Sequence, residues 1–311
     1  FSFAMLSVHG EEDAVLSGNS FVMQLKNGHF IVSDGGFAFD AEYLVQYMKS
    51  KLPNGETPVV DAWFSSHLHT DHSMVFNGMR LYKEVRESIK VEAVYLNIPN
   101  ENVIRNTDLD EGPARELPKQ IESILTGIRM LKTTDDKTTK IYRCQTGHRY
   151  YFDGVTVDVV LAQEQLEFNC YDQNKYVGDF NTSSTALLFT TDTNHKIFTA
   201  GDSNESNTSY IMEAYGSTCP SILSNVNVFV AFHHGHNTVK SFTTWLKPNA
   251  TKFDYVLFSS NLAVESIEDR IETEDGANTE LRAKANQCYS FSDGLKTILN
   301  FTNSGITVTR E

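Results

Sequence analysis

A histidine-rich loop directly after an apolar run is the feature that most constrains how this chain can fold. Residues 59–64 (VVDAWF) favour a strand, and residues 65–72 (SSHLHTDH) follow at once. Side chains of an extended segment alternate in direction, so His67 and His69 are predicted to point to the same side. The fold must therefore place a strand end where several imidazoles can converge.

Several side chains of this loop have the chemistry of metal ligands. His67 and His69 can share one ion. Asp71 and His72 follow where the chain must turn toward the next element, and they can face a neighbouring ion. Imidazole nitrogens with a few carboxylate oxygens favour zinc, and manganese and iron are the alternatives. The density of ligands argues against scattered surface histidines and favours two divalent metal ions over one.

Two later strand ends add candidate ligands. Residues 196–200 (KIFTA) form a short apolar run that leads into Gly-Asp202, and Asp202 is predicted to bridge the two ions. Residues 226–232 (VNVFVAF) form another such run, which ends in residues 233–236 (HHGH). A histidine of this last segment is expected to complete the ligands of the second ion. Asp202 and Asp71 are the candidate catalytic residues.

In this chain order, the His-x-His-x-Asp-His loop, the Gly-Asp and the His-His-Gly make the chain resemble the metallo-β-lactamase superfamily. The resemblance covers nearly the whole chain, because residues 5–8, 13–16 and 30–36 look like the opening strands and the Asp-Gly-Gly turn of that fold. It implies a single domain over residues 1–311 with an α/β fold. The expected architecture is a four-layer αββα sandwich, in which two mixed sheets carry helices on both outer sides. The metals would then lie at one edge, where the loops converge.

Within the superfamily, the chain looks most like the metallohydrolase domains of DNA-uptake competence proteins and like bacterial phosphorylcholine esterases. The Gly-Asp and His-His-Gly forms and residues 181–184 (NTSS) carry this finer resemblance. The family usually places the ligand next to the glycine, which implies that His234 is the ligand. His233 and His236 would then contact the substrate or support the ligands. The choice between His233 and His234 stays open at this point.

One part of the family pattern is missing from the sequence. Many relatives place a further histidine between the first motif and the Gly-Asp, but the stretch before that strand offers Asn181, Ser183 and Ser184 instead. The first metal site is therefore expected to be open, weakly occupied or completed by water. Asn181 is a candidate for substrate binding. His148 and His195 lie in this interval, and their polar turns are typical of exposed histidines.

The predicted chemistry is hydrolysis of an ester, a phosphoester or an amide. Two ions about 3.5 to 4 Å apart can share a water and lower its pKa, which supplies a metal-bridging hydroxide. The sequence has neither a Gly-x-Ser-x-Gly elbow nor a P-loop, which disfavours serine nucleophiles and nucleoside triphosphates. The resemblance implies a phosphoester substrate, and among phosphoesters a phosphodiester. The alternatives are a lactonase or β-lactamase-type hydrolase and a metal-binding domain without turnover.

Composition bears on partners and location. The formal net charge of −14 does not favour a nucleic-acid partner, because such binding depends on lysine and arginine, although a local basic patch would allow it. No apolar run is long enough to predict a membrane span. The start at Phe1 rather than Met suggests a removed upstream segment and export, with a cytoplasmic location as the alternative. The cysteines show no Cys-x-x-Cys spacing, so they predict neither a zinc finger nor a redox motif.

Apolar periodicity predicts the elements around these loops. The expected helices span residues 40–52, 78–89 and 114–132, and the expected strands and hairpin span residues 91–96, 150–161, 295–301 and 306–309. Residues 168–180, which are polar and aromatic, are expected either to line the substrate cleft or to form an ordinary surface loop. No linker rich in Pro, Gly or Ser interrupts this pattern, which favours one domain.

Overall fold

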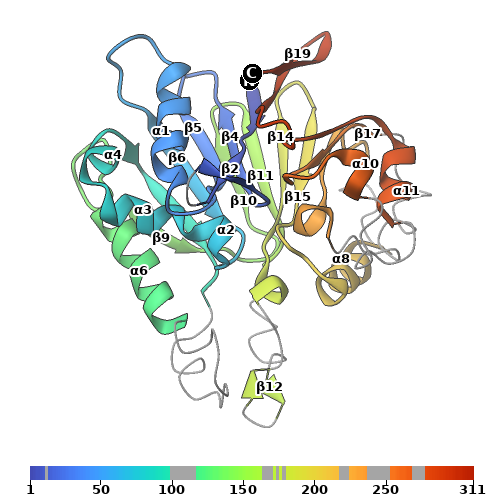
Figure 1. Ribbon diagram of the computed structural model, residues 1–311, viewed down its shortest axis with the longest axis horizontal. Coiled ribbons are helices and arrows are strands. Elements are labelled where there is room, and N and C mark those ends of the chain that lie inside the picture. The colour runs from blue at the N-terminus through green and yellow to red at the C-terminus, as the bar shows by residue number, and fades with distance from the viewer. Residues whose placement is uncertain are drawn as a thin grey trace.

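Two mixed β-sheets packed face to face form the centre of the computed structural model, and helices cover the outer side of each sheet (Figure 1). The structure describes residues 1–10, 13–98, 117–162, 171–172, 175–176, 180–216, 224–236, 253–267 and 277–311. The α/β class and the four-layer αββα sandwich predicted from the sequence are confirmed. None of the described helices has the length and apolar character needed to cross a membrane.

The first sheet has the strand order β20-β19-β1-β4-β5-β6-β8-β9, with β7 paired to β6. Its strands are β1 (Ser2–Met5), β4 (Ser20–Gln24), β5 (Phe30–Asp34), β6 (Val59–Ser65), β7 (Lys90–Val91), β8 (Ala93–Leu96), β9 (Lys140–Arg143), β19 (Thr297–Thr302) and β20 (Gly305–Arg310). The strands from β20 to β5 pair antiparallel, and β5, β6, β8 and β9 pair parallel. Because β5 and β6 are parallel neighbours, Asp34 and the histidine loop emerge at the same edge.

The second sheet has the strand order β10-β11-β14-β15-β16-β17-β18. Its strands are β10 (Arg149–Phe152), β11 (Val155–Leu161), β14 (Ala186–Thr191), β15 (Lys196–Thr199), β16 (Val228–Val230), β17 (Phe253–Phe258) and β18 (Ala285–Ser290). The strands β15, β16 and β17 are parallel neighbours, so the segments that follow them also meet at one edge. Two short ribbons, β2 (Val8–His9) with β3 (Val15–Leu16) and β12 (Tyr171–Asp172) with β13 (Lys175–Tyr176), lie outside both sheets.

Helices of the first half cover the first sheet, and helices of the second half cover the second sheet (Figure 1). The first group contains α1 (Asp40–Ser50), α2 (Thr70–Ser73), α3 (Val75–Leu81), α4 (Lys83–Glu87) and α6 (Leu117–Met130). The second group contains α8 (Glu205–Gly216), α10 (Val264–Ile267) and α11 (Ala277–Lys284). The short 3-10 helices η3 (Phe180–Ser183) and η4 (Phe232–Gly235) lie next to the strand ends of the second sheet.

Most of the predicted elements agree with the structure, but one expected helix and one expected strand are each divided in two. The single helix expected over residues 78–89 is wrong, because Tyr82 is extended and separates α3 from α4. The Arg86 guanidinium donates to the carbonyls of Met79 and Arg80. These carbonyls lie in the last turn of α3 and have no partner within the helix, so a side chain takes the place of the next helical turn. The strand expected over residues 91–96 is likewise divided into β7 and β8. Residues 114–116 and most of residues 168–180 lie outside the described part of the chain.

An apolar core between the two sheets holds the strand ends in place. Phe3 and Phe21 of the first sheet stack with ring centroids 5.5 Å apart, and Phe189 of the second sheet lies 6.5 Å from Phe3. Phe64, in the strand that leads into the histidine loop, also contacts the Phe189 ring, at 6.3 Å. Aromatic contacts of this kind fix the sheets against each other. The loops at the strand ends therefore have a rigid base.

Candidate metal centre

The predicted ligands come from strand ends of both sheets that meet at one edge of the sandwich. The histidine loop follows β6, Asp202 follows β15, and the His-His-Gly segment lies in η4 after β16. Two overlapping groups of ligand atoms, each within 4.8 Å of one another, result from this arrangement. The first group consists of His67, His69 and Asp202, and the second consists of Asp71, His72, Asp202 and His234.

Asp202 belongs to both groups and presents one oxygen to each. Its Oδ1 lies 3.1 Å from His72 Nε2 and 3.5 Å from His234 Nε2. Its Oδ2 lies 3.7 Å from His67 Nε2. Ligand atoms of one tetrahedral zinc are roughly 3.4 Å apart, because each lies about 2.0 to 2.1 Å from the ion. The carboxylate therefore separates two positions that could each hold an ion.

The second position has donor atoms that form no hydrogen bond of good geometry with any residue that the structure describes. Asp71 Oδ2 lies 3.0 Å from His234 Nε2 and 3.6 Å from His72 Nε2. Both Nε2 atoms and Asp202 Oδ1 are fully buried, yet they form no hydrogen bond of good geometry. Buried polar atoms in native proteins are normally paired. Buried nitrogen and oxygen atoms that converge in this way without a hydrogen bond of good geometry fit the donor set of a divalent metal.

Neighbouring side chains fix which nitrogen of each imidazole faces the second position. His72 Nδ1 donates to Asp34 Oδ2 at 3.1 Å, and His234 Nδ1 pairs with Ser259 Oγ at 2.9 Å. With Nδ1 engaged, Nε2 offers its lone pair to an ion. Sequence reasoning noted Asp34 only as part of a turn and did not single out Ser259. Asp34 ends β5, which is parallel to the strand β6 that leads into the histidine loop. Ser259 follows β17, which is parallel to the strand β16 that leads into the His-His-Gly segment. The position at the end of an apolar strand is the sequence signal that could have indicated both residues.

The first position is built mainly from the histidine loop. His67 Nε2 lies 2.9 Å from His69 Nδ1, so the two side chains meet on one side as strand alternation predicts. His67 is fully buried and its Nδ1 lies 3.1 Å from Ser66 Oγ, whereas His69 is partly exposed. Ser66 also donates its backbone N–H and its hydroxyl to Asp34. The Asp34 carboxylate thus supports the ligands of both positions.

Three residues other than glycine have a strained backbone at this cluster. Asp34, His233 and His234 adopt positive φ values of 58°, 49° and 57°. Gly201 has φ +53°, and a Cβ atom there would lie 2.7 Å from Ser66 Oγ. Positive φ in residues other than glycine costs about 1 to 3 kcal/mol each and is typically found at functional sites. The fold therefore accepts strain where the candidate ligands converge.

Burial and the mutual charges shift the pKa values of the cluster in opposite directions. Burial raises the pKa of Asp202, but His72 and His234 outweigh burial and hold that pKa well below its usual value. Burial lowers the pKa of His234, but Asp202 and Asp71 outweigh burial and raise it to about 9. Burial and the nearby His72 lower the pKa of His67. The carboxylates are therefore anionic at neutral pH and attract a cation.

The other predicted site residues lie around the two groups of ligand atoms. The His233 Nε2 atom is 3.6 Å from Asp202 Oδ2, and the His236 ring centroid is 5.4 Å from that of His233. Asn181 is buried in η3, where its backbone carbonyl accepts from Asn207 Nδ2, and it belongs to neither group. Its predicted role in substrate binding stays a prediction.

The two histidines predicted to lie in polar turns are not part of the cluster. His148 is exposed and its Nδ1 lies 3.4 Å from the Tyr150 hydroxyl. His195 is partly buried, and its Nδ1 pairs with Thr193 Oγ1 at 2.9 Å. Neither residue supplies the histidine that the family pattern places before the Gly-Asp.

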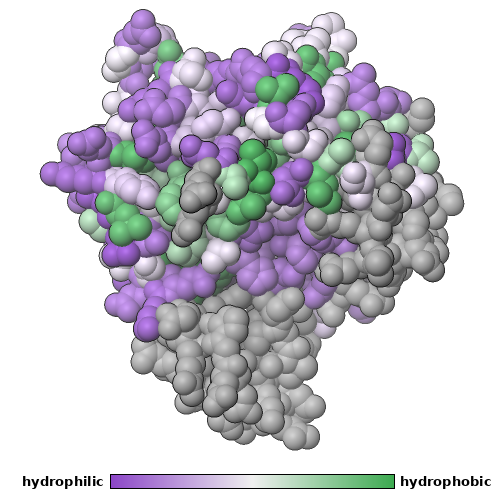
Figure 2. Space-filling model, in the orientation of Figure 1, coloured by the Kyte–Doolittle hydropathy of each residue, from purple (hydrophilic) through white to green (hydrophobic). Residues whose placement is uncertain are grey.

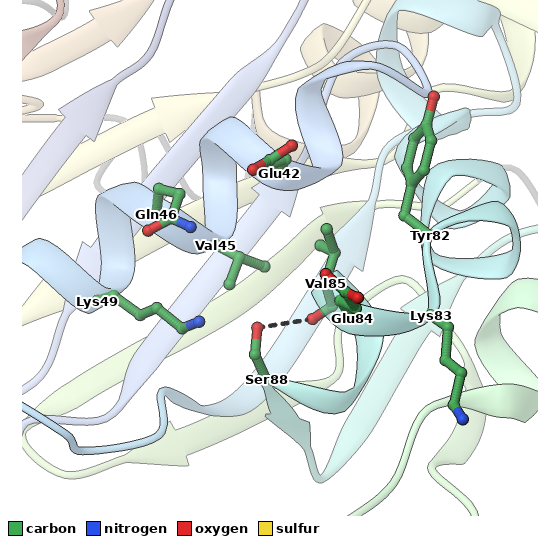
Figure 3. Close-up of a pocket in the computed structure, with 9 residues that line it drawn as sticks. All are labelled: Glu42, Val45, Gln46, Lys49, Tyr82, Lys83, Glu84, Val85 and Ser88. Atoms are coloured by element: carbon green, nitrogen blue, oxygen red, sulfur yellow. Dashed lines mark hydrogen bonds between the residues drawn. The ribbon is translucent and has the colours of Figure 1, made fainter.

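A groove of about 480 Å³ between α1 and α4 is separate from the cluster (Figure 3). Lys49 and Glu42 extend toward it from α1, and Lys83 and Glu84 line it from the α4 side. None of the candidate metal ligands lines this groove, so the groove is not the candidate active site. The visible face of the molecule is mostly hydrophilic, with apolar side chains gathered across its middle (Figure 2).

No family model and no curated protein sequence matches this chain. Solved structures with similarity include the metallo-β-lactamase-fold protein YhfI from Bacillus subtilis, at 13% identity over 100% of this chain and 99% of that one, with a TM-score of 0.49. Zn²⁺-bound PqqB from Methylobacterium extorquens is 8% identical over 95% and 99% of the two chains, with a TM-score of 0.46. MEM-A1, a subclass B3 metallo-β-lactamase from a soil metagenome, is 12% identical over 71% and 76%, with a TM-score of 0.39. These scores are low, so the chain's own residues carry the functional argument.

Proposed function

We propose that this chain is a metal-dependent hydrolase of the metallo-β-lactamase superfamily that holds two divalent ions and cleaves a phosphoester, specifically a phosphodiester. The observation that carries the proposal is the Asp202 carboxylate, whose two oxygens face separate groups of ligand atoms. Zinc is the favoured ion, with Mn²⁺ and Fe²⁺ as alternatives, because the ligands are imidazole nitrogens and carboxylate oxygens.

The ligands divide between the two ions around the shared carboxylate. His67 and His69 would hold the first ion, and Asp71, His72 and His234 would hold the second, with Asp202 between them. When bound, such ions lower the pKa of a shared water, which makes a nucleophile available at neutral pH, and they stabilise the charge that develops on the attacked group.

Asp71 would bind the second ion and help to orient the attacking water. Its side chain is 22% exposed, whereas Asp202 is 1% exposed, so Asp71 lies on the accessible side of the cluster. Burial raises the pKa of Asp71, but His72 and His234 outweigh burial and hold the pKa below its usual value. The carboxylate therefore stays ionised near neutral pH and would accept a hydrogen bond from the water. His236 and Asn181 are the candidates for contacts to the substrate.

The choice of a phosphodiester rests on the resemblance of the Gly-Asp and His-His-Gly segments to phosphate-ester hydrolases. A fold and a metal site do not by themselves define the substrate. The formal net charge of −14 favours a small phosphodiester over a nucleic acid. A lactonase or β-lactamase-type activity and metal binding without turnover are the alternatives that an assay must separate.

The test combines metal content with turnover. Protein purified without chelator is analysed for metals, and hydrolysis of bis-p-nitrophenyl phosphate is measured in zinc and in manganese. We expect near two ions per chain and turnover that Asp71→Ala abolishes. Asp61→Ala, which removes an aspartate paired with His29 instead of the cluster, is the control and should keep both.

Three outcomes would contradict parts of the proposal. One ion or none with no turnover would reject the hydrolase and favour a binding domain. Two ions with turnover of a lactone or a cephalosporin, but not of the phosphodiester, would reject the substrate class alone. Full activity in Asp71→Ala would reject the role of Asp71.

A further inference from the structure

His233 and His234 are adjacent in sequence but face opposite oxygens of Asp202. The Nε2 atom of His234 lies 3.5 Å from Oδ1, on the side of the second position. The Nε2 atom of His233 lies 3.6 Å from Oδ2, the oxygen that His67 Nε2 approaches to 3.7 Å. Both distances at Oδ2 are close to the separation of roughly 3.4 Å between ligands of one tetrahedral zinc. His233 lies outside the group in which all ligand atoms are within 4.8 Å of one another, so its side chain would have to turn toward His67 to share an ion.

The backbone explains how two neighbouring residues can serve two positions. His233 and His234 adopt φ values of 49° and 57°, and Gly235 follows with φ 87°. Such consecutive left-handed residues are rare outside glycine and persist only where surrounding structure holds them. The His233 backbone N–H donates to the carbonyl of Gly201 at 3.1 Å. This bond ties the histidine pair directly to the strand end that carries Asp202.

We propose that His233 is a ligand of the first ion, in the place of the histidine that the sequence lacks before the Gly-Asp. This inference rests on the proposed dinuclear function and changes the predicted role of His233 from substrate contact to metal binding. The first ion would have the imidazoles of His67, His69 and His233 with one oxygen of Asp202. The second ion would have the imidazoles of His72 and His234 and the carboxylates of Asp71 and Asp202. The first site is then nitrogen-rich, and the shared water of the proposed function would bind beside these protein ligands.

The first test measures metal binding instead of activity. His233→Asn is the informative variant, because asparagine tolerates positive φ and replaces the imidazole with an amide, which is not a usual zinc ligand. We expect wild type to bind two zinc ions and His233→Asn to bind the first ion at least tenfold more weakly. Removing even a hydrogen-bond partner of a metal ligand lowers metal affinity by about 10- to 100-fold, and the loss of a ligand itself should cost no less. His236→Asn changes a histidine whose ring lies 5.4 Å from that of His233 and should leave both affinities unchanged.

The second test gives a positive signature of ligation. In His233→Cys loaded with cobalt, a thiolate at this position should produce a near-ultraviolet thiolate-to-cobalt charge-transfer band. Wild type and His236→Cys should lack this band, which controls for the native cysteines and for the loop. Far-ultraviolet circular dichroism of the metal-free variants checks that each is folded.

The outcomes separate this inference from the proposed function. Unchanged affinity for both ions in His233→Asn, together with no band in His233→Cys, would overturn the role of His233 while leaving a dinuclear site. Equal loss of metal in His233→Asn and His236→Asn would also overturn it, because the effect would then belong to the loop. A wild-type protein that binds no metal would reject the proposed function itself.

Discussion

Replacing Asp34 with asparagine should weaken the second metal position without removing any ligand. The Asp34 carboxylate is 1% exposed, accepts from His72 Nδ1 at 3.1 Å and accepts the Ser66 backbone N–H at 2.7 Å. In Asp34→Asn, an amide oxygen can still accept from the Ser66 backbone. The amide nitrogen would then face His72 Nδ1 as a donor. The imidazole proton would be driven to Nε2, the atom that must hold the metal.

The size of the effect follows from the same contacts. Loss of a group that orients a metal-binding histidine costs about 10- to 100-fold in affinity, which corresponds to about 1.4 to 2.7 kcal/mol. Asparagine adopts positive φ readily, so the φ of 58° at this position adds little strain to the variant. The change in affinity should therefore report on the tautomer of His72 and not on a damaged turn.

Zinc affinity can be measured by competition with a fluorescent chelator. Asp61→Asn is the matched control, because Asp61 also pairs with an imidazole, His29 Nδ1 at 2.8 Å, but lies away from the cluster. We expect Asp34→Asn to bind the more weakly held ion at least tenfold less tightly and Asp61→Asn to match wild type. Equal zinc affinities in all the proteins would refute the reasoning that Asp34 sets the tautomer of His72.

Four further predictions concern the metal-free cluster and the core. Because Asp202 and Asp71 raise the pKa of His234 to about 9 from 6.5, zinc binding at pH 7.5 should release a proton, which calorimetry in buffers of different ionisation enthalpy can count. The same shift stabilises the metal-free fold below pH 6.5, and unfolding should show this contribution lost as pH rises toward 9. Gly201→Ala should destabilise the protein by about 1 to 3 kcal/mol, since φ is +53° and the added Cβ meets Ser66 Oγ at 2.7 Å; an unchanged Tm would contradict this. Phe189→Ala, at a side chain 1% exposed, should cost about 3 to 5 kcal/mol in urea unfolding while leaving the zinc stoichiometry at two.

The candidate ligands could be predicted because their signals are local in sequence. The alternation of side chains in a strand already places His67 and His69 together, and strand-like runs before Asp202 and His234 bring those residues to strand ends. The fold class followed from these same strand ends once the resemblance was recognised. In both cases, the informative pattern spans only a few consecutive residues.

The supporting contacts could not be predicted because they join distant parts of the chain. Asp34 pairs with His72 across 38 residues, and Ser259 reaches His234 across 25 residues, so neither pairing leaves a periodic pattern. Which oxygen of Asp202 faces His233 depends on positive φ values that the residue types do not indicate. The break at Tyr82 likewise depends on Arg86 of α4, whose guanidinium binds the carbonyls at the end of α3.

Asp202 is proposed to hold two ions, one at each oxygen. Anomalous diffraction at the zinc absorption edge, from crystals of the zinc-loaded protein, would locate each ion separately. We expect two peaks about 3.5 to 4 Å apart, one beside His67 and Oδ2 of Asp202 and the other beside His234 and Oδ1. A single peak, or zinc bound away from Asp202, would contradict the dinuclear site.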